Sequence, residues 1–278
     1  MEKVLLWTIS TYCNLNCRYC YYTAEERRNK SLKNLLGAYE QIFQLNPSVI
    51  YISGEPSLLS NLKDIVCELK ARLPNCRLIL TTNAVSLSKE KILDVIEHIA
   101  MFLVSLDGPN EDLHNLYRSD FDKVIHSIDL INELRNDHLL LGITSVVHRY
   151  NLSVIEESSR FFIANHVDYI HFQPLYIENG TDLGSLNNQQ LLDMYEEITL
   201  LKKQYIDINF SSNEYLTALK NYSLTGNFGM KCHNGEEVFF LSENGELKNC
   251  PSPFVDSCEQ TLNCINMIEL ANIISVLR

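Results

Sequence analysis

Short apolar runs alternate with segments of helical periodicity over the first 175 residues. The runs are rich in Val, Ile, Leu and aromatic residues, as in strands that are buried on both faces of a sheet. They predict strands at 4–9, 48–52, 77–82, 101–106, 139–147 and 169–175. Between the runs, apolar residues recur at intervals of three and four, which indicates amphipathic helices. These helices are predicted at 31–45, 62–73, 88–99, 122–134 and 152–163, with Ser31 opening the first and Ser88 capping the third.

The order of these elements predicts the topology of the chain. Strands that alternate with helices form a parallel sheet with right-handed crossover connections. Eight such repeats close a full barrel and need about 250 residues. Six repeats in residues 1–178 therefore predict an α/β fold with a partial (β/α)6 barrel, similar to a TIM barrel that is open on one side.

The remaining third of the chain has a different pattern. Residues 179–184 are linker-like, and helices are predicted at roughly 186–204 and 213–221. In residues 236–250 an Asn-Gly pair at 244–245 predicts the tight turn of a β-hairpin. We expect a helical linker segment at 179–230 and a small C-terminal hairpin and helix domain at 231–278.

Composition and charge narrow the class of protein. The 278 residues carry a net charge of −12, which argues against a general nucleic-acid or anionic-membrane binder. The sequence has no apolar run of about 18 residues, as a membrane span requires. The N-terminal residues do not resemble a signal peptide. We expect a cytoplasmic protein.

Nine cysteines are unusual for such a chain, because disulfides are not the default in the cytosol. Three of them, Cys13, Cys17 and Cys20, lie within eight residues directly after the first predicted strand. Thiolates select zinc, copper(I) or iron–sulfur clusters. Three thiolates on a four-iron cluster leave one iron open to another ligand, whereas a structural zinc site would need a fourth ligand from elsewhere.

The spacing Cys-x3-Cys-x2-Cys, with Tyr19 before the last cysteine, resembles that of the radical S-adenosylmethionine (radical SAM) superfamily. The resemblance implies a [4Fe-4S] cluster whose open iron binds S-adenosylmethionine (SAM). Reductive cleavage of SAM then yields a 5′-deoxyadenosyl radical that abstracts a substrate hydrogen.

Other segments at predicted strand ends agree with this resemblance. "SGEP" at 53–56 resembles the family's Gly-Gly-Glu-Pro motif, which implies that its glutamate binds the SAM ammonium. "SLDGP" at 105–109 resembles a segment of the peptide-modifying branch, where the serine contacts the SAM ribose; its aspartate could equally cap the following turn. The positions that we expect to bind SAM are Tyr19, Ser53, Gly54, Glu55, Pro56, Asn83, Ser105 and Asp107.

Several other polar residues have simpler interpretations. Arg118 and Arg149 are candidates to pair with the SAM carboxylate, but a surface position is expected for either. His171 is expected to find a local hydrogen-bond partner at a strand end. Cys67 and Cys76 are expected to be core residues, because free cysteine is among the most buried residue types.

Four further cysteines lie in the last 47 residues. Cys232 and Cys250 flank the predicted hairpin as Cys-x12-Gly-x4-Cys, which resembles the opening of the SPASM extension. Only Cys258 and Cys264 follow, which resembles the shortened "twitch" form with one auxiliary [4Fe-4S] cluster. The spacing of these last two matches no standard pair, and four cysteines suit a structural zinc equally well.

These patterns together favour a radical SAM enzyme that modifies a ribosomally made peptide by a crosslink, a thioether or an epimerisation. Pro251 stands where sulfatase-maturing members carry an acidic residue, which disfavours that activity, and we expect no leader-peptide domain before the barrel. An electron donor such as flavodoxin or ferredoxin is an expected partner. The alternatives are a dehydrogenase of a small molecule such as an aminocyclitol or sugar, and a regulatory module that binds zinc or a cluster.

Overall fold

Six parallel strands form the centre of the molecule. The computed structural model describes residues 2–20, 22–28, 34–175, 184–230, 232–249, 265–273 and 276–277. The six strands are β1 (Val4–Thr8), β2 (Val49–Ser53), β3 (Arg77–Thr82), β4 (Met101–Ser105), β5 (Leu140–Val147) and β6 (Tyr169–Pro174). They pair side by side in chain order, and every pair is parallel, as the alternating pattern predicts.

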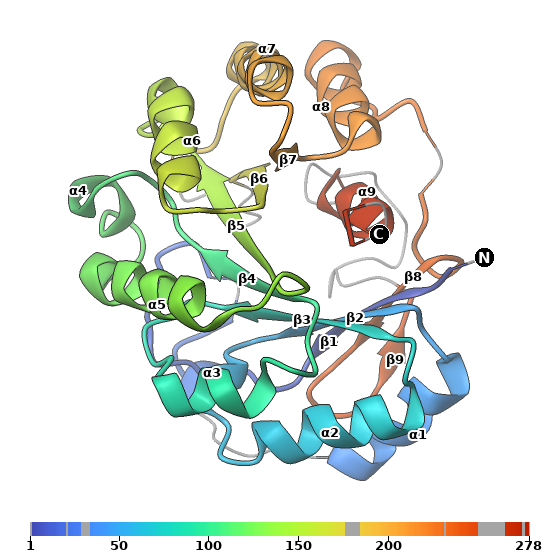
Figure 1. Ribbon diagram of the computed structural model, residues 1–278. Coiled ribbons are helices and arrows are strands. Elements are labelled where there is room, and N and C mark those ends of the chain that lie inside the picture. Colours follow the sequence, from blue (N-terminus) through green and yellow to red (C-terminus); the bar gives the residue numbers. More distant parts are fainter. Residues whose placement is uncertain are drawn as a thin grey trace.

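Helices return the chain between these strands and cover the outer side of the sheet (Figure 1). They are α1 (Leu35–Leu45), α2 (Leu62–Arg72), α3 (Lys89–Val95), α5 (Phe121–Leu134) and α6 (Ile155–Ala164), with the short α4 (Glu111–His114) before α5. Ser88 caps α3 as predicted, because its side chain accepts a hydrogen bond from the Lys91 amide. The predicted start of the first helix is wrong: Asn34 caps it by accepting from the Gly37 amide at 3.0 Å.

Additional strands extend both edges of the sheet. The helices α7 (Asn188–Gln204) and α8 (Asn213–Thr225) flank the short β7 (Asn209–Phe210), which pairs with β6. On the other edge β8 (Val238–Leu241) pairs in parallel with β1, and β9 (Leu247–Lys248) pairs antiparallel with β8. The strand order is β7-β6-β5-β4-β3-β2-β1-β8-β9. The end strands do not pair with each other, so the predicted partial barrel is confirmed. None of the described helices is both long and apolar enough to span a membrane.

The predicted hairpin around Gly245 is present as β8 and β9. Gly245 has a positive φ of 78°, and its amide donates to the Ser242 carbonyl at 2.9 Å, which closes the turn. Because β8 lies in register with β1, the hairpin continues the barrel sheet. Sequence patterns do not reveal this pairing. The division of the chain into a linker segment at 179–230 and a C-terminal domain at 231–278 stays a prediction.

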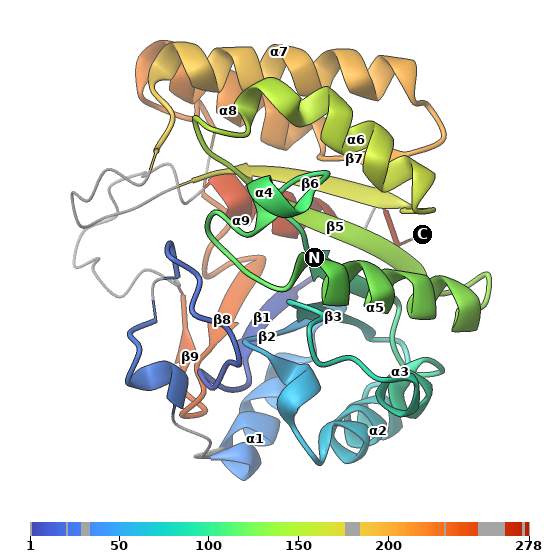
Figure 2. The same ribbon diagram turned by 90° about the vertical axis from the view of Figure 1, so that its left-hand side faces the viewer.

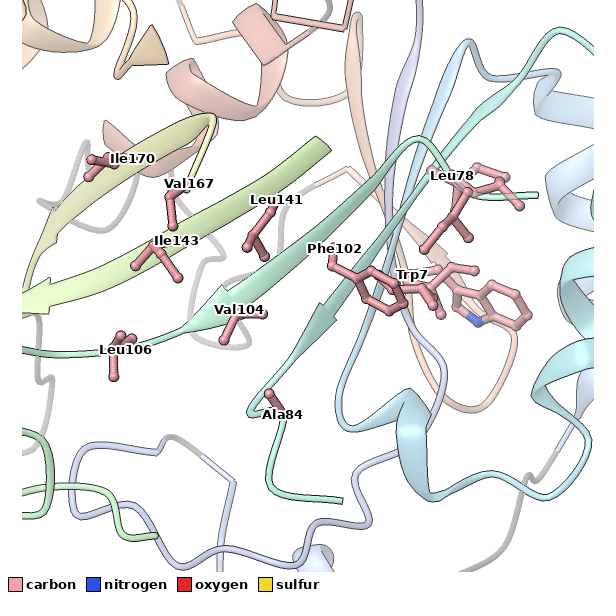
Figure 3. Packing of buried hydrophobic residues seen from close by; sticks show 14 of the residues in the cluster. Trp7, Leu78, Ala84, Phe102, Val104, Leu106, Leu141, Ile143, Val167 and Ile170 are labelled. Carbon is pink, nitrogen blue, oxygen red and sulfur yellow. The ribbon is translucent and has the colours of Figure 1, made fainter. Parts of the chain in front are cut away.

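The main core lies between the sheet and its outer helices. Alternate residues of each strand face this layer, such as Leu5 and Trp7 of β1 and Phe102 and Val104 of β4. Figure 3 shows Trp7, Leu78, Phe102 and Val104 along the outer face of the strands. Each large apolar side chain that is fully buried contributes about 1.5–3 kcal/mol to folding.

A C-terminal helix fills the base of the open barrel. This helix, α9 (Ile265–Asn272), lies between α8 and β8 on the open side of the strand arc (Figures 1 and 2). Ile273, which follows it, packs among inner-face residues of the strands, namely Val4, Val49, Tyr51, Ile79, Met101, Leu103 and Tyr169. Buried Glu269 of α9 accepts hydrogen bonds from the Tyr169 hydroxyl at 2.6 Å and the Ser212 amide at 2.8 Å. The helix therefore closes part of the gap that two missing βα units leave.

Candidate metal and cofactor site

The cysteine-rich loop, residues 9–28, follows β1 at the carboxyl ends of the parallel strands. Backbone hydrogen bonds hold it in place: the Cys13 amide donates to the Arg27 carbonyl at 3.1 Å, and the Arg18 amide donates to the Tyr117 carbonyl at 2.9 Å. The Thr11 hydroxyl donates to the Glu26 carbonyl at 2.8 Å. The loop is thus fastened to itself and to the segment after β4, at the face where barrel enzymes carry their active sites.

Cys13, Cys17 and Cys20 all lie in this loop, and all three are half-buried. Burial raises the pKa of the Cys13 and Cys17 thiols, and the neighbouring cysteines raise it further. A bound metal reverses this tendency, because a coordinating thiol is deprotonated outright. The three side chains are consistent with a site that is completed by metal.

Across the described residues, no three His, Cys, Asp or Glu side chains gather closely enough to hold a single metal ion. The assignment of Cys13, Cys17 and Cys20 as the ligands of a cluster stays a prediction.

Gly54 lies where the ends of β1 and β2 approach each other. Its φ is +92°, and a Cβ at this position would lie 2.1 Å from the Ser10 carbonyl oxygen. Ser53 stands where the family motif has its first glycine, and its hydroxyl donates to the Trp7 carbonyl at 3.1 Å. Only the second motif position therefore requires glycine, and serine at the first position adds a link between the strands.

Glu55 is a buried carboxylate that has only neutral partners in the described part of the chain. It accepts hydrogen bonds from the Ser57 hydroxyl, the Thr82 hydroxyl at 2.6 Å and the Asn83 amide at 2.7 Å. Burial raises its pKa, and these hydrogen bonds oppose the rise. A buried carboxylate without a cation is well suited to a cationic ligand, such as the ammonium that the resemblance implies. Pro56 follows at the start of a buried 3-10 turn, Pro56–Leu58.

Asn83 joins this carboxylate to the cysteine-rich loop. Its side-chain amide donates to the Cys13 sulfur at 3.5 Å and to the Asn14 side-chain oxygen at 2.8 Å, while its backbone amide binds Glu55. Residues from the ends of β1, β2 and β3 are thereby brought into one hydrogen-bonded group. The Ser57 and Thr82 contacts to Glu55 were not anticipated from the sequence, although both residues adjoin the predicted motifs.

Ser105 and Asp107 have different environments at the end of β4. Ser105 is buried, and its hydroxyl makes no hydrogen bond within the described residues. The Asp107 carboxylate instead binds inside the protein. It accepts from the Tyr19 hydroxyl, from Arg118 Nε at 2.8 Å and from the Val146 amide at 3.0 Å. The predicted roles of Ser105 and Asp107 toward SAM stay predictions.

The remaining polar candidates divide between interior and surface. The surface position expected for Arg118 is wrong, because its side chain is only 11% exposed and is paired with Asp107. Arg149 is exposed, as expected, with its guanidinium 5.7 Å from the Tyr150 ring centre. His171 has the local partner that was expected, since its Nδ1 lies 2.8 Å from the Ser211 hydroxyl.

The two mid-chain cysteines differ from each other. Cys76 is buried, as expected, and burial raises its pKa to about 12. The prediction that Cys67 belongs to the core is wrong. It is half-buried on α2, with its sulfur 3.5 Å from Nε2 of His98, because its position on the helix faces the turn after α3.

Only part of the second cysteine group can be placed. Cys232 is half-buried, and its sulfur accepts a hydrogen bond from the Asn234 amide at 3.5 Å. Cys250, Cys258 and Cys264 lie outside the described residues. A Cβ on Gly235 would lie 3.1 Å from Asn249, so the chain just after Cys232 contacts the chain just before Cys250.

The sequence profile of the radical SAM superfamily matches residues 7–162, which is more than half of the chain. The chain therefore belongs to the radical SAM superfamily. Members of this superfamily bind a [4Fe-4S] cluster and SAM.

Similar proteins agree with this assignment. An uncharacterised protein of Methanocaldococcus jannaschii, MJ0907, is 26% identical over 98% of this chain and 92% of its own. The cysteine-type anaerobic sulfatase-maturating enzyme of Clostridium novyi is 24% identical over 89% of this chain and 73% of its own. The crystal structure of Streptococcus suis SuiB bound to SAM superposes on 98% of this chain, with a TM-score of 0.73 and 18% identity. This chain spans 65% of the length of SuiB. The sulfatase-maturating enzyme and SuiB are homologues of the SPASM and twitch type, and the shortened form of the extension stays a prediction.

Proposed function

We propose that this protein is a radical SAM enzyme that modifies a ribosomally made peptide. The observation that carries the radical SAM site is the convergence of Cys13, Glu55 and Asn83 at the carboxyl ends of three neighbouring strands. In this proposal Cys13, Cys17 and Cys20 hold three irons of a cluster. When bound, the cluster and SAM supply a 5′-deoxyadenosyl radical that abstracts a hydrogen from the substrate.

The chain's own residues bind and orient SAM. Ionised Glu55 pairs with the SAM ammonium, and its hydrogen bonds to Thr82 and Asn83 hold the carboxylate in one orientation. The free Ser105 hydroxyl binds the ribose. The close approach at Gly54 keeps Glu55 and its partners against the cysteine-rich loop, which would hold bound SAM beside a cluster carried by that loop.

The preference for a peptide rests on the relatives. The Clostridium novyi enzyme is named for the maturation of a sulfatase, and SuiB has been crystallised with its precursor peptide SuiA. Pro251 after Cys250 disfavours sulfatase maturation itself, so we propose another peptide as the substrate. Oxidation of a small molecule such as an aminocyclitol is the competing proposal. An electron donor such as flavodoxin or ferredoxin would reduce the cluster.

The decisive experiment uses anaerobically reconstituted protein. With dithionite and SAM it should release 5′-deoxyadenosine, and Cys13→Ala, Cys17→Ala and Cys20→Ala should each abolish the release. Cys76→Ala, which removes a cysteine at the opposite end of the barrel, should still release it. Undiminished release by any variant of the three loop cysteines would refute the site.

The substrate class is tested with peptides encoded by short reading frames beside the gene. Incubation with such a peptide should change its mass, by the loss of two hydrogens for a crosslink or thioether. An epimerised residue is detected by deuterium uptake from heavy water. If SAM cleavage is stimulated by aminocyclitols or sugars and by none of these peptides, the peptide proposal is wrong.

We further propose that Cys232, Cys250, Cys258 and Cys264 hold an auxiliary [4Fe-4S] cluster. The contact between Gly235 and Asn249 supports this, because it draws together the two segments that carry the first two cysteines. A triple variant that lacks Cys13, Cys17 and Cys20 should then keep about four irons and a brown colour. A colourless triple variant with one zinc would replace the proposal with a structural zinc site.

A further inference from the structure

Three neighbouring strands carry polar residues side by side on the inner face of the barrel. Ser105 of β4 pairs in register with Thr144 of β5, and Thr144 pairs with His171 of β6. The residue before each of them belongs to the core beneath the outer helices (Figure 3), namely Val104, Ile143 and Ile170. Because successive side chains of a strand point to opposite faces, Ser105, Thr144 and His171 face the inside of the barrel. We call these three residues the polar row.

The next inward-facing row, toward the amino ends of the strands, is an apolar floor. It consists of Leu103, Gly142 and Tyr169, which pair in register two residues before the polar row. A Cβ on Gly142 would lie 3.0 Å from the Leu103 side chain and 3.1 Å from the Tyr169 ring, so these side chains close over the glycine. The polar row is therefore the first hydrogen-bonding layer above the floor.

Two hydroxyls of the polar row have no partner in the part of the chain that the structure describes. Ser105 is 8% exposed and Thr144 is 9% exposed, and neither hydroxyl makes a hydrogen bond there. Neither oxygen is among the fully enclosed side-chain atoms that lack a partner, so both remain accessible from inside the barrel. Buried polar groups are nearly always hydrogen-bonded, so two neighbouring unpartnered hydroxyls point to a ligand.

The position of Thr144 separates it from the proposed SAM site. Ser105 is the last residue of β4, at the mouth of the barrel, where we propose that it binds the SAM ribose. Strand β5 continues beyond Thr144 to Val147, so Thr144 lies deeper along its own strand. Adjacent strands are about 5 Å apart, so a group bound to Thr144 would lie inside the barrel beside the ribose position.

The surroundings of Thr144 are uncharged. Burial lowers the pKa of His171, so its ring is neutral at pH 7, and its Nδ1 lies 2.8 Å from the Ser211 hydroxyl. The buried carboxylate of Glu269, at the base of the barrel, is already bound by the Tyr169 hydroxyl and the Ser212 amide. A ligand ammonium beside Thr144 would thus have no free carboxylate in the polar row or the apolar floor, and a buried unpaired charge is costly. A hydroxyl can both donate to and accept from an amide.

We infer that Thr144 is a substrate-binding residue whose hydroxyl holds an uncharged hydrogen-bonding group of the substrate, such as the backbone amide of a peptide. This inference deepens the proposed function and rests on it, because SAM at the mouth leaves the polar row to the substrate. It favours a peptide over an aminocyclitol, which carries ammonium groups.

The first test measures the stability of the iron-loaded full-length protein. Thr144→Val replaces the hydroxyl with a methyl group of similar size. Because the hydroxyl has no partner within the described residues, this variant should keep the wild-type Tm or exceed it. A Tm several degrees lower would show that the hydroxyl has a structural role, and would overturn the inference.

The second test measures SAM affinity by anaerobic equilibrium dialysis. Thr144→Val should bind SAM with the wild-type Kd, because the inference gives this hydroxyl to the substrate. A higher Kd for SAM would assign Thr144 to the SAM site and overturn the inference.

The third test uses the peptides encoded by short reading frames beside the gene. On a peptide that the wild type modifies, Thr144→Val should raise KM about tenfold with kcat unchanged, because it removes one hydrogen bond to the bound substrate. Thr144→Ser keeps a hydroxyl and should restore most of the affinity. Ser145→Ala is the matched control, because it removes a buried hydroxyl from the opposite face of the same strand, and it should leave KM unchanged.

The outcomes separate this inference from the proposed function. Equal KM values for Thr144→Val and the wild type overturn the inference and leave the proposed function intact. Streptamine, an aminocyclitol with two ammonium groups, should not stimulate SAM cleavage by the wild type, and stimulation would overturn the inference. A wild type that modifies none of the peptides overturns the proposed function, and the inference with it.

Discussion

Glu55→Gln is the substitution that tests the SAM site most directly. It keeps the volume of the side chain and removes its negative charge. The carboxylate now accepts three hydrogen bonds, from Ser57, Thr82 and the Asn83 amide, and has no cationic partner in the described part of the chain. Glu55→Ala would leave these three buried donors without an acceptor, at about 1–3 kcal/mol each, and would confuse lost binding with lost stability.

The expected effect on binding follows from the burial of Glu55, which is 1% exposed. Removing one partner of a buried, hydrogen-bonded charge pair costs on the order of 2–5 kcal/mol. At 1.4 kcal/mol per factor of ten, this corresponds to a Kd for SAM that is roughly thirtyfold to several thousandfold higher. Iron content should not change, because Glu55 is not a cluster ligand.

The same carboxylate predicts a pH dependence. Burial raises the pKa of Glu55 in the folded protein without SAM. Its contribution to stability is therefore present below the ordinary glutamate pKa and is lost as the pH rises through the raised value. SAM binding has the opposite pH dependence, because the SAM ammonium needs an ionised carboxylate as its partner. SAM affinity should thus increase as the pH rises through the raised pKa, and Glu55→Gln should lose this dependence.

The assay is anaerobic equilibrium dialysis of iron-loaded protein against labelled SAM, with iron measured in the same samples. Glu269→Gln is the matched control, because it changes a buried, hydrogen-bonded glutamate at the base of the barrel. It should bind SAM as the wild type does. Wild-type affinity in Glu55→Gln would refute the ammonium pairing and leave Glu55 with a structural role.

Three further predictions concern stability and thiol chemistry. Gly54→Ala should lower Tm, because a positive φ costs about 1–3 kcal/mol of backbone strain in alanine. The added methyl group would also lie 2.1 Å from the Ser10 carbonyl oxygen. An unchanged Tm would contradict this prediction. Glu269→Ala should leave two donors, the Tyr169 hydroxyl and the Ser212 amide, without an acceptor. It should lower the free energy of unfolding by about 1–3 kcal/mol for each donor, measured by urea denaturation. Iodoacetamide should label half-buried Cys67 faster than Cys76, whose pKa burial raises to about 12; equal rates by mass spectrometry would contradict the difference in burial.

Much of the site follows from local sequence pattern and topology. The alternation of strands and helices predicts a parallel sheet, and in such a sheet residues that follow the strands meet at one edge. Cys13, Glu55 and Asn83 follow the first three strands, and the structure brings them into one hydrogen-bonded group. Their proximity could be predicted because it depends only on strand order and direction.

Other features depend on contacts between distant segments, which leave no periodic signal in the chain. The burial of Arg118 depends on Asp107 eleven residues earlier and on the Tyr19 ring, so its sequence neighbours wrongly suggested a surface position. The same holds for Cys67, whose half-exposed position depends on which side of α2 faces α3.

The pairing of β8 with β1 and the place of α9 in the open barrel were likewise decided by tertiary structure. A hairpin and an amphipathic helix are recognisable from their own residues, but the surfaces they cover are not. The sequence by itself determined the elements, their order and the residues at the strand ends. Only tertiary packing decided which elements cover the open side of the barrel and which charged side chains are buried. Both depend on the shape and the unpaired edges of the whole sheet.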